Sequence, residues 1–439
     1  MSLAQNWLLT AVSTPPEKIK EEIEMSDDLV IAGDEFHARD LEQAAVIRNP
    51  FPYYDMLRDK PLQFGVRGYP PGTVEGMDEP IPSWAVLKYK DLIHVASNHQ
   101  IFSSRDRMQE QSDAPTLMLV NHDQPEHTWL RTIARKAFSP KRVEADVAPW
   151  LHETVADMLN EEGSGHLDVM TNLAADLPPK YIAKLLGTPA EDFKKIRGWA
   201  DAYMGTSTMT MSEKAQSNVE LHEYYTDQVG QRYDMIKRGM ANDDLLTGFI
   251  EASGDDGRKL TPEEVVRFCI TMVAGGAESS VFLIGNQVAA MLEMPELYQQ
   301  MRDDRSLVRP FLEESIRRDG PIQRLFRECL EDTEIGGTSI KKGEWVCVFF
   351  GAGNHDPEMF ERPHEFILNR PNVGKNLTFS HGIHHCIASI VARNEAAAMI
   401  NGILDRYQRV DPGSGPVTYQ DRNFINYGPS SCPVNVVPA

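Results

Sequence analysis

The most informative segment of this 439-residue chain is FSHGIHHC, residues Phe379–Cys386. A clear helical pattern follows it, from Ser389 to Leu404. Cys386 therefore stands just before a helix N-terminus, where the helix dipole and the free N–H groups favour a thiolate. A thiolate is either a nucleophile or a soft metal ligand. The glycine and histidine that precede Cys386 at these spacings argue against a purely structural cysteine.

Composition describes an ordinary but acidic globular protein. Lys and Arg number 44, Asp and Glu number 65, and the formal net charge is −21. Such a surface argues against nucleic acid or an anionic membrane as the main partner. The length allows one large domain or two or three ordinary ones.

The five cysteines are too few and too scattered for a disulfide framework, and none forms a C-x-x-C pair. The apolar stretch Trp7–Val12 has no basic residue before it, and no apolar run reaches the length of a membrane span. We therefore expect a cytoplasmic protein without a membrane anchor. No glycine-rich phosphate loop indicates a nucleotide site.

Periodicity predicts a mainly α chain with small β-sheets. Residues 1–45 read as a partly ordered leader, and residues 100–330 are rich in helical patterns. Strands are expected near residues 60–90, 331–350 and 408–439. Within the second of these, the glycines at 336, 337 and 343 predict a hairpin that includes Trp345–Phe350.

A long helix is expected from Thr261 to about Met291, because Thr261 and Glu264 form a capping box around Pro262. Its middle is AGGAESS, residues 274–280. Two adjacent glycines inside a helix cost roughly 2 kcal/mol, and a carboxylate in an apolar stretch is also expensive. One interpretation is a packing notch with Glu278 in solvent; the other is a site where a ligand approaches the backbone.

The stretch from Phe379 to Cys386 resembles the heme-binding loop of the cytochrome P450 family, F-G-x-G-x-H-x-C-x-G. Phe379, Gly382, His384 and Cys386 match, whereas Ser380 and Ala388 replace the first and last glycines. This resemblance implies heme b, an iron protoporphyrin IX, with Cys386 as the axial ligand to the metal.

Three further motifs of that family follow in its order. Glu314 and Arg317 resemble the E-x-x-R pair, whose members share one helix face and can pair. Glu278 and Ser279 resemble the acid–alcohol pair of the central I helix that crosses the heme. His127-Thr128-Trp129-Leu130-Arg131 resembles the helix that meets the heme propionates. The resemblance spans about residues 49 to 438, which implies a single domain over residues 46–439.

The resemblance assigns a role to each matching position. Phe379 would shield the sulfur, and Glu314 with Arg317 would be structural. Glu278 and Ser279 would be catalytic and deliver protons. The propionates would be held by His127, Arg131, Arg327 and His384. Residues 104–120, Met204–Met211, the Gly275-Gly276 groove, Phe424 and Ile425 would line the substrate pocket.

The implied activity is monooxygenation, in which one oxygen atom of O₂ enters a small to medium, largely apolar organic substrate. Electrons would come from a separate [2Fe–2S] ferredoxin and its reductase. A basic cluster on and after the propionate helix could dock this acidic partner, or could simply be solvated. Its members are Arg131, Arg135, Lys136, Lys141 and Arg142.

Two alternatives stay open at the level of sequence. A heme-thiolate peroxygenase, isomerase or sensor would keep the pigment but would not consume NADH-derived electrons in step with product. A Cys386 nucleophile enzyme without heme would be colourless and sensitive to alkylating reagents.

Overall fold

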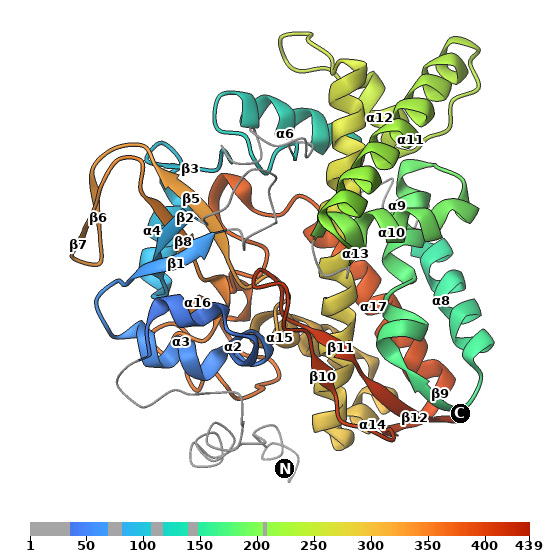
Figure 1. Ribbon diagram of the computed structural model, residues 1–439. Coiled ribbons are helices and arrows are strands. Elements are labelled where there is room, and N and C mark those ends of the chain that lie inside the picture. The colour runs from blue at the N-terminus through green and yellow to red at the C-terminus, as the bar shows by residue number, and fades with distance from the viewer. Residues whose placement is uncertain (1–35, 69–80, 107–116, 139–147, 205–208) are drawn as a thin grey trace, which may run out of the picture.

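The protein has a helix-rich half and a smaller half that contains most of the β-structure (Figure 1). The structure, a computed structural model, describes residues 36–68, 81–106, 117–138, 148–204 and 209–439. One buried hydrophobic cluster fills the helix-rich half and two smaller clusters underlie the strands. The expectation of a mainly α protein with small sheets is confirmed.

Helices account for most of the described chain. The α-helices are α2 (Ala44–Arg48), α3 (Phe51–Arg58), α4 (Tyr89–Ser97), α6 (Glu126–Ala137), α8 (Ala148–Glu162), α9 (Leu177–Leu186), α10 (Phe193–Met204), α11 (Met211–Lys237), α12 (Leu245–Glu251), α13 (Pro262–Glu293), α14 (Pro295–Asp303), α15 (Val308–Arg318), α16 (Phe350–Asn354) and α17 (Ser389–Arg406). Short helical turns are η2 (Ala38–Glu42), η4 (Met170–Ala174), η5 (Ala190–Asp192), η6 (Arg305–Leu307), η7 (Val373–Lys375) and η8 (Gly382–His384).

The strands form one larger and three small sheets. They are β1 (Phe64–Gly68), β2 (Ile81–Val86), β3 (Phe102–Ser103), β4 (Gly165–Asp168), β5 (Leu325–Cys329), β6 (Thr333–Ile335), β7 (Thr338–Ile340), β8 (Trp345–Val348), β9 (Tyr407–Pro412), β10 (Thr418–Tyr419), β11 (Pro429–Ser431) and β12 (Pro433–Pro438). The larger sheet has the order β1-β2-β8-β5-β3, and the small ones are β4-β12-β9, β10-β11 and β6-β7.

The predicted hairpin around residues 334–350 was only half right. Strands β6 and β7 form a tight hairpin through Gly336 and Gly337, which both have positive φ. Strand β8 does not pair with β7; it lies parallel to β2 and antiparallel to β5. All four residues of β8 are buried, so burying this apolar run inside the larger sheet outweighs the local turn signal.

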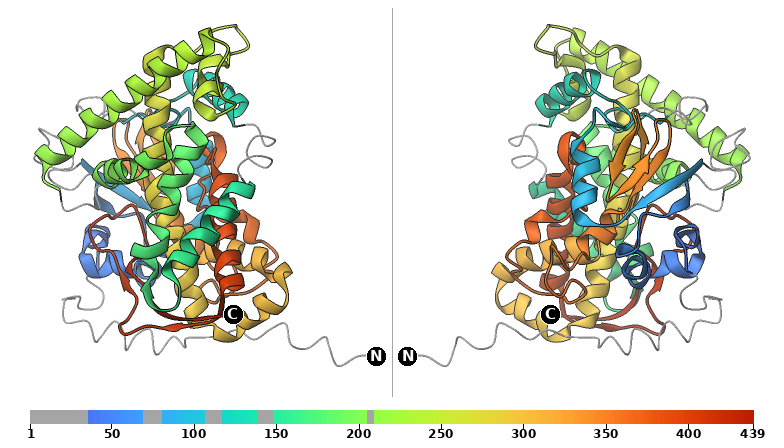
Figure 2. Two further views of the ribbon diagram at one scale, coloured as in Figure 1. Left: turned by 90° about the vertical axis from the view of Figure 1, so that its right-hand side faces the viewer. Right: turned by 90° about the vertical axis from the view of Figure 1, so that its left-hand side faces the viewer.

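Helix α13 is the central element, as its length predicted. It contacts α9, α10, α11, α12 and α17, so it is surrounded on several sides (Figure 2). The capping box forms: the Glu264 backbone N–H donates to Thr261 Oγ at 3.2 Å, and Glu264 Oε2 accepts from the Thr261 N–H at 2.7 Å. Helix α13 is long and apolar enough to cross a membrane. However, 72% of its most apolar 18-residue segment is buried inside the protein, as expected of a core helix.

The folded body begins earlier than residue 46. Phe36, Ala38 and Leu41 are buried, and they pack in the cluster that includes Phe51 and Tyr54. The segment from residue 36 to 45 therefore belongs to the body rather than to a leader. The preceding part of the predicted leader, residues 1–35, lies outside the described residues.

Candidate active site

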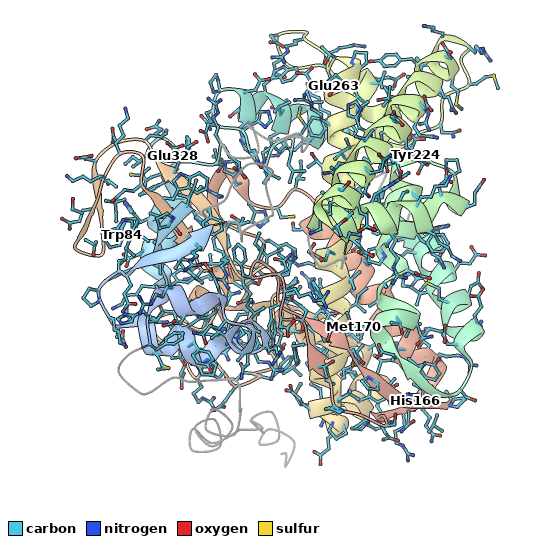
Figure 3. The ribbon with its side chains drawn as sticks, viewed as in Figure 1. Trp84, His166, Met170, Tyr224, Glu263 and Glu328 are labelled. Atoms are coloured by element: carbon cyan, nitrogen blue, oxygen red, sulfur yellow. The ribbon has the colours of Figure 1, made fainter. Side chains whose placement is uncertain are left out.

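A cavity of about 1590 Å³ lies where α13, α17, the 378–388 loop and β5 meet. In Figure 3, Glu263 marks the beginning of α13, and Glu328 marks β5, which borders the cavity. A cavity for one drug-sized ligand usually measures about 300–1,000 Å³. The larger volume therefore has room for a bulky cofactor and a substrate together.

The loop that carries Cys386 is folded back on itself beside this cavity. The Cys386 backbone N–H donates to the Phe379 carbonyl at 2.8 Å, and both residues line the cavity. Gly382 has φ +71°, and a Cβ there would lie 2.5 Å from the Ala96 carbonyl oxygen of α4. Only glycine fits at such a position. Ser380 occupies the same left-handed region with φ +62°, which is unfavourable for a serine.

The thiol of Cys386 does not have the lowered pKa that its place before α17 suggested. Burial raises the pKa of this thiol, and this effect outweighs the Ala388 backbone N–H and the guanidinium groups of Arg131 and Arg393, which all favour the thiolate. The sequence argument considered the helix end and left out the desolvation of the side chain. Coordination to a metal ion is the effect that would deprotonate such a thiol outright.

Four nitrogen-bearing side chains converge on the cavity from separate elements. His127 and Arg131 come from α6, Arg327 from β5 and His384 from η8, and all four line the cavity. The rings of His127 and His384 lie 4.4 Å apart. Burial is the main cause that lowers the pKa of His127 to about 4 and that of His384 to about 2. The two imidazoles are therefore neutral in the protein alone.

Two observations show that this cluster fits an anionic ligand. Burial lowers the pKa of Arg327 to about 10, which means that its cationic form lacks full compensation. The Arg327 side chain donates a hydrogen bond from Nη1 to the Phe326 carbonyl at 2.6 Å. His127 Nε2 and Ser380 Oγ are buried without a hydrogen-bond partner among the described residues. A ligand with carboxylate groups, such as the two propionates of heme, would satisfy these groups.

Helix α13 opens toward the cavity at its glycines. A Cβ at Gly275 would meet no atom within 4 Å, whereas one at Gly276 would lie 3.4 Å from Ile182 Cδ1. Gly275, Gly276 and Ser279 line the cavity, and the Ser279 hydroxyl donates to the Gly275 carbonyl at 3.0 Å. The glycines therefore let a ligand approach the helix backbone, which favours a ligand groove over a packing notch.

Glu278, unlike its neighbour Ser279, points away from the cavity. Its side chain is only 4% exposed and does not border the cavity. Asn426 Nδ2 donates to Glu278 Oε2 at 2.5 Å. The interpretation that placed Glu278 in solvent is thus wrong.

Glu314 and Arg317 form an ion pair at 2.8 Å, and neither side chain has any exposure. Arg370 donates to both carboxylate oxygens of Glu314. Arg317 also donates to the carbonyls of Asn354, Pro363 and Glu365. The pair therefore ties α15 to residues 354–370.

Sequence reasoning predicted no specific contact for four polar side chains at or behind the cavity, although Ser104 lies within the predicted 104–120 segment. Ser104 lies 2.9 Å from His384 Nε2, and Asn426 holds Glu278. Ser280 hydrogen-bonds Glu395 of α17, and both line the cavity. Burial raises the pKa of Glu395 to about 8. The acid beside Ala396-Ala397-Ala398 was a visible signal for Glu395, whereas the hydrogen-bond partners of the other three depend on tertiary packing.

The predicted substrate-pocket residues meet at the cavity where they are described. Phe424 and Ile425 line it, together with Ser104–Asp106 and Leu117–Asn121. Met209 is exposed. The segments 107–116 and 205–208 and the side chains of Met204 and Met211 lie outside the described residues, so the lining role of Met204–Met211 stays a prediction.

The basic cluster is only partly available on the surface. Arg135 is exposed, but the Arg131 guanidinium donates to the His385 carbonyl at 2.7 Å. Lys136 donates to the Ser253 carbonyl at 2.7 Å and pairs with Asp255. Lys141 and Arg142 lie outside the described residues.

Comparison with known proteins identifies the family of this arrangement. The sequence profile described as Cytochrome P450 matches residues 199–429. A putative cytochrome P450, YjiB of Bacillus subtilis, is 30% identical over 369 residues, which cover 83% of this chain and 88% of that protein. The biotin biosynthesis cytochrome P450 of the same organism is 31% identical, with 82% and 89% covered.

Solved structures agree with the sequence comparison. Cytochrome P450 CYP109Q5 from Chondromyces apiculatus has a TM-score of 0.78 and 27% identity, covering 90% of this chain and 97% of that one. CYP109E1 from Bacillus megaterium in complex with corticosterone has a TM-score of 0.76 and 28% identity, covering 89% and 99%. The cysteine loop, the cluster of His127, Arg131, Arg327 and His384, and the central helix meet at one cavity, and the chain belongs to the cytochrome P450 family of heme b monooxygenases.

Proposed function

We propose that this cytochrome P450 holds heme b through Cys386 and inserts one oxygen atom of O₂ into a small to medium, largely apolar molecule. The observation that carries the proposal is the position of Cys386 at one cavity whose walls include the α13 glycines. Bound through a cysteine thiolate, heme b activates O₂ for this insertion.

The side chains of the chain divide the work of holding the heme. Cys386 would provide the sulfur that holds the iron, and Phe379, whose ring centre lies 4.4 Å from the Arg393 guanidinium, would shield that sulfur from water. Arg131 and Arg327 would neutralise the propionates, and the neutral His127 and His384 would help to orient them by hydrogen bonding. Their own buried or cationic character supports this role, because each gains a partner when an anion binds.

The part of the cavity wall formed by α13 would supply protons and leave space for the substrate. The Ser279 hydroxyl faces the cavity and can exchange its bond to the Gly275 carbonyl for one to a ligand. Glu278, the next residue, would hand protons to Ser279. Overall, RH, O₂, two electrons and two protons give ROH and H₂O, so two protons must reach the cavity in each cycle.

For the substrate and the electron donor, we infer a chemical class rather than a particular molecule. CYP109E1, a similar structure, holds corticosterone or testosterone in two of its complexes. The cavity of about 1590 Å³ supports an apolar substrate of up to that general size. We infer a [2Fe–2S] ferredoxin with its reductase as the electron donor, because Arg135 remains exposed as a basic docking residue on an otherwise acidic protein. We infer the cytoplasm as the place of action, because all five cysteines are free thiols, as in a reducing compartment.

Cys386→Ser tests this function directly. Treated with a reductant and carbon monoxide, the purified protein should show the red-shifted absorption band of thiolate-ligated heme, and Cys386→Ser should lack that band. Cys432→Ser is the matched control, because Cys432 is buried and does not line the cavity.

Other outcomes identify the rival functions. A colourless protein that is inactivated by alkylation of Cys386 would indicate a nucleophile enzyme. A pigment with the thiolate band whose product does not follow NADH-derived electrons would indicate a peroxygenase, isomerase or sensor.

A further inference from the structure

The Glu278 carboxylate and the Asn426 amide meet directly behind the cavity wall. Their side chains are 4% and 1% exposed, and the hydrogen bond between them measures 2.5 Å. Ser279 follows Glu278 and lines the cavity, and Ile425 precedes Asn426 and also lines it. The hydrogen bond therefore joins the helix that faces the ligand to the segment that faces the substrate.

Asn426 is held firmly on its own side. Its carbonyl accepts from Gln420 Nε2 at 2.5 Å, and its backbone forms a β-bridge with Ile322. The preceding carbonyl, that of Ile425, accepts from the Gln323 N–H at 2.8 Å. Because the backbone is fixed at these points, the amide is a stable support for the acid.

An amide is a suitable partner for an acid that changes its protonation state. It carries a donor in Nδ2 and an acceptor in Oδ1. The Asn426 Oδ1 atom is buried and has no hydrogen-bond partner among the described residues. The amide can donate to the Glu278 carboxylate and, after rotation about its last side-chain bond, accept from the protonated acid. It can thus hydrogen-bond both forms, whereas a cation favours only the ionised one.

We propose that Asn426 is a positioning residue for proton delivery, which holds Glu278 for transfer to Ser279 and ties this acid to the Phe424–Ile425 segment. The inference rests on the proposed monooxygenase function. It predicts a specific failure when the amide is lost. O₂ with two electrons and two protons then leaves as H₂O₂, whereas intact delivery without substrate carries O₂ with four electrons and four protons to two H₂O.

The test compares Asn426→Ala and Asn426→Leu with a control in the same region. Asn286 Nδ2 donates to the carbonyls of Asp319 and Tyr427, at 2.7 and 3.1 Å. Asn286→Ala therefore loosens the same segment and leaves the Asn426–Glu278 bond in place. The Leu variant fills the space of the lost amide, so that at least one variant is expected to bind heme.

Each holoenzyme is supplied with a [2Fe–2S] ferredoxin, its NADH-dependent reductase and O₂, without added substrate. NADH, O₂ and H₂O₂ are then measured. We expect the rate of water formation to fall roughly tenfold in the Asn426 variants, the usual effect of losing a hydrogen bond to a charged group. In the Asn426 variants, the number of NADH molecules consumed per O₂ should fall toward one. The Asn286→Ala control should keep the NADH-to-O₂ ratio of the wild type.

An infrared measurement provides a readout that does not depend on turnover. The carboxyl band of Glu278 is assigned by its loss in Glu278→Gln. This band should shift in the Asn426 variants and stay in place in Asn286→Ala. A band and an NADH-to-O₂ ratio that are unchanged in the Asn426 variants, or an equal defect in Asn286→Ala, would overturn the inference.

Failure of this inference is distinct from failure of the proposed function. A wild type that lacks the thiolate band with carbon monoxide, or that consumes no NADH, contradicts the function itself. If the wild type passes both measurements and the Asn426 variants behave like the wild type, only the role of Asn426 is contradicted.

Discussion

Ser380 shows how one side chain departs from its family and is strained as a result. It has φ +62° where the family pattern has glycine, and its buried hydroxyl oxygen has no protein partner in the described parts of the chain. The left-handed conformation costs an L-residue roughly 1–2 kcal/mol. The chain accepts this strain six residues before Cys386.

Ser380→Gly is therefore expected to stabilise the holoenzyme by about 1 kcal/mol, since the relief of strain exceeds the extra chain entropy of glycine. The urea midpoint of unfolding measures this change. Gly382→Ala is the opposite case: its Cβ would lie 2.5 Å from the Ala96 carbonyl, so stability should fall. Lower stability in Ser380→Gly would show that the serine hydroxyl makes a compensating bond to the bound heme.

Glu395 is the second informative residue, because burial raises the pKa of its carboxyl from 4.5 to about 8. The folded protein therefore binds this proton more tightly than the unfolded chain does. The stability that the proton contributes is complete below pH 4.5 and is lost as the pH rises through about 8. At about 1.36 kcal/mol per pKa unit, this loss is on the order of 5 kcal/mol.

Glu395→Gln should remove this pH dependence. Between pH 5 and 9, roughly the range of the titration, the variant should gain stability relative to the wild type as the pH rises. Urea unfolding at each pH measures the difference. The exposed Glu191 provides the control, and Glu191→Gln should follow the wild type throughout. Parallel curves for Glu395→Gln and the wild type would contradict the raised pKa.

At the scale of elements, α15 is fastened to the chain that leads to the cysteine loop. Glu314 accepts from Arg317, Arg370 and the Ile367 backbone N–H, and Arg317 reaches three carbonyls. Because both charges are fully buried, each depends on the other for its stability. This network fixes residues 354–370, from which the chain continues to Phe379 and Cys386.

Glu314→Ala is expected to abolish heme incorporation rather than to slow turnover. Removing one partner of a buried pair costs about 3–5 kcal/mol, because the other charge is left uncompensated. The ratio of heme absorbance to protein absorbance measures the effect. Glu313, the adjacent acid, pairs with Arg393 at the surface side of the same helix, and Glu313→Ala should keep most of its heme. Normal heme content in Glu314→Ala would contradict a structural role.

At the scale of the whole molecule, an acidic protein presents a small basic site beside the cavity that Arg131 lines. The net charge is −21, yet α6 carries Arg131 and the exposed Arg135. Helix α6 lies at the top of the molecule in Figure 1, and β9 lies at the bottom. An acidic ferredoxin would be steered toward the α6 end.

Arg135→Glu should lower the rate of electron transfer from a [2Fe–2S] ferredoxin several-fold at low salt, and the difference should shrink as salt screens the charges. Stopped-flow reduction under carbon monoxide measures this rate. Arg409→Glu makes the same change of charge on β9 and should leave the rate unaltered. Equal effects of the two variants would show that only net charge matters, and no effect would exclude α6 as the docking site.

Local sequence patterns were enough to predict the main helices and to nominate candidate site residues. The FSHGIHHC loop, the capped α13 helix with its glycines and the Glu314–Arg317 spacing are local patterns, so their chemistry is readable from neighbouring residues. Cavity residues such as His127, Arg327 and Ile425 were predicted from the resemblance of these patterns to the motifs of the cytochrome P450 family.

Tertiary structure alone decided what burial and long-range contacts control. It placed β8 inside the larger sheet, turned Glu278 away from the cavity toward Asn426, and buried Cys386 so that its thiol pKa rises. It also brought Glu395 beside Ser280. Local sequence cannot report these features, because desolvation and the partner of a side chain depend on residues more than a hundred positions away.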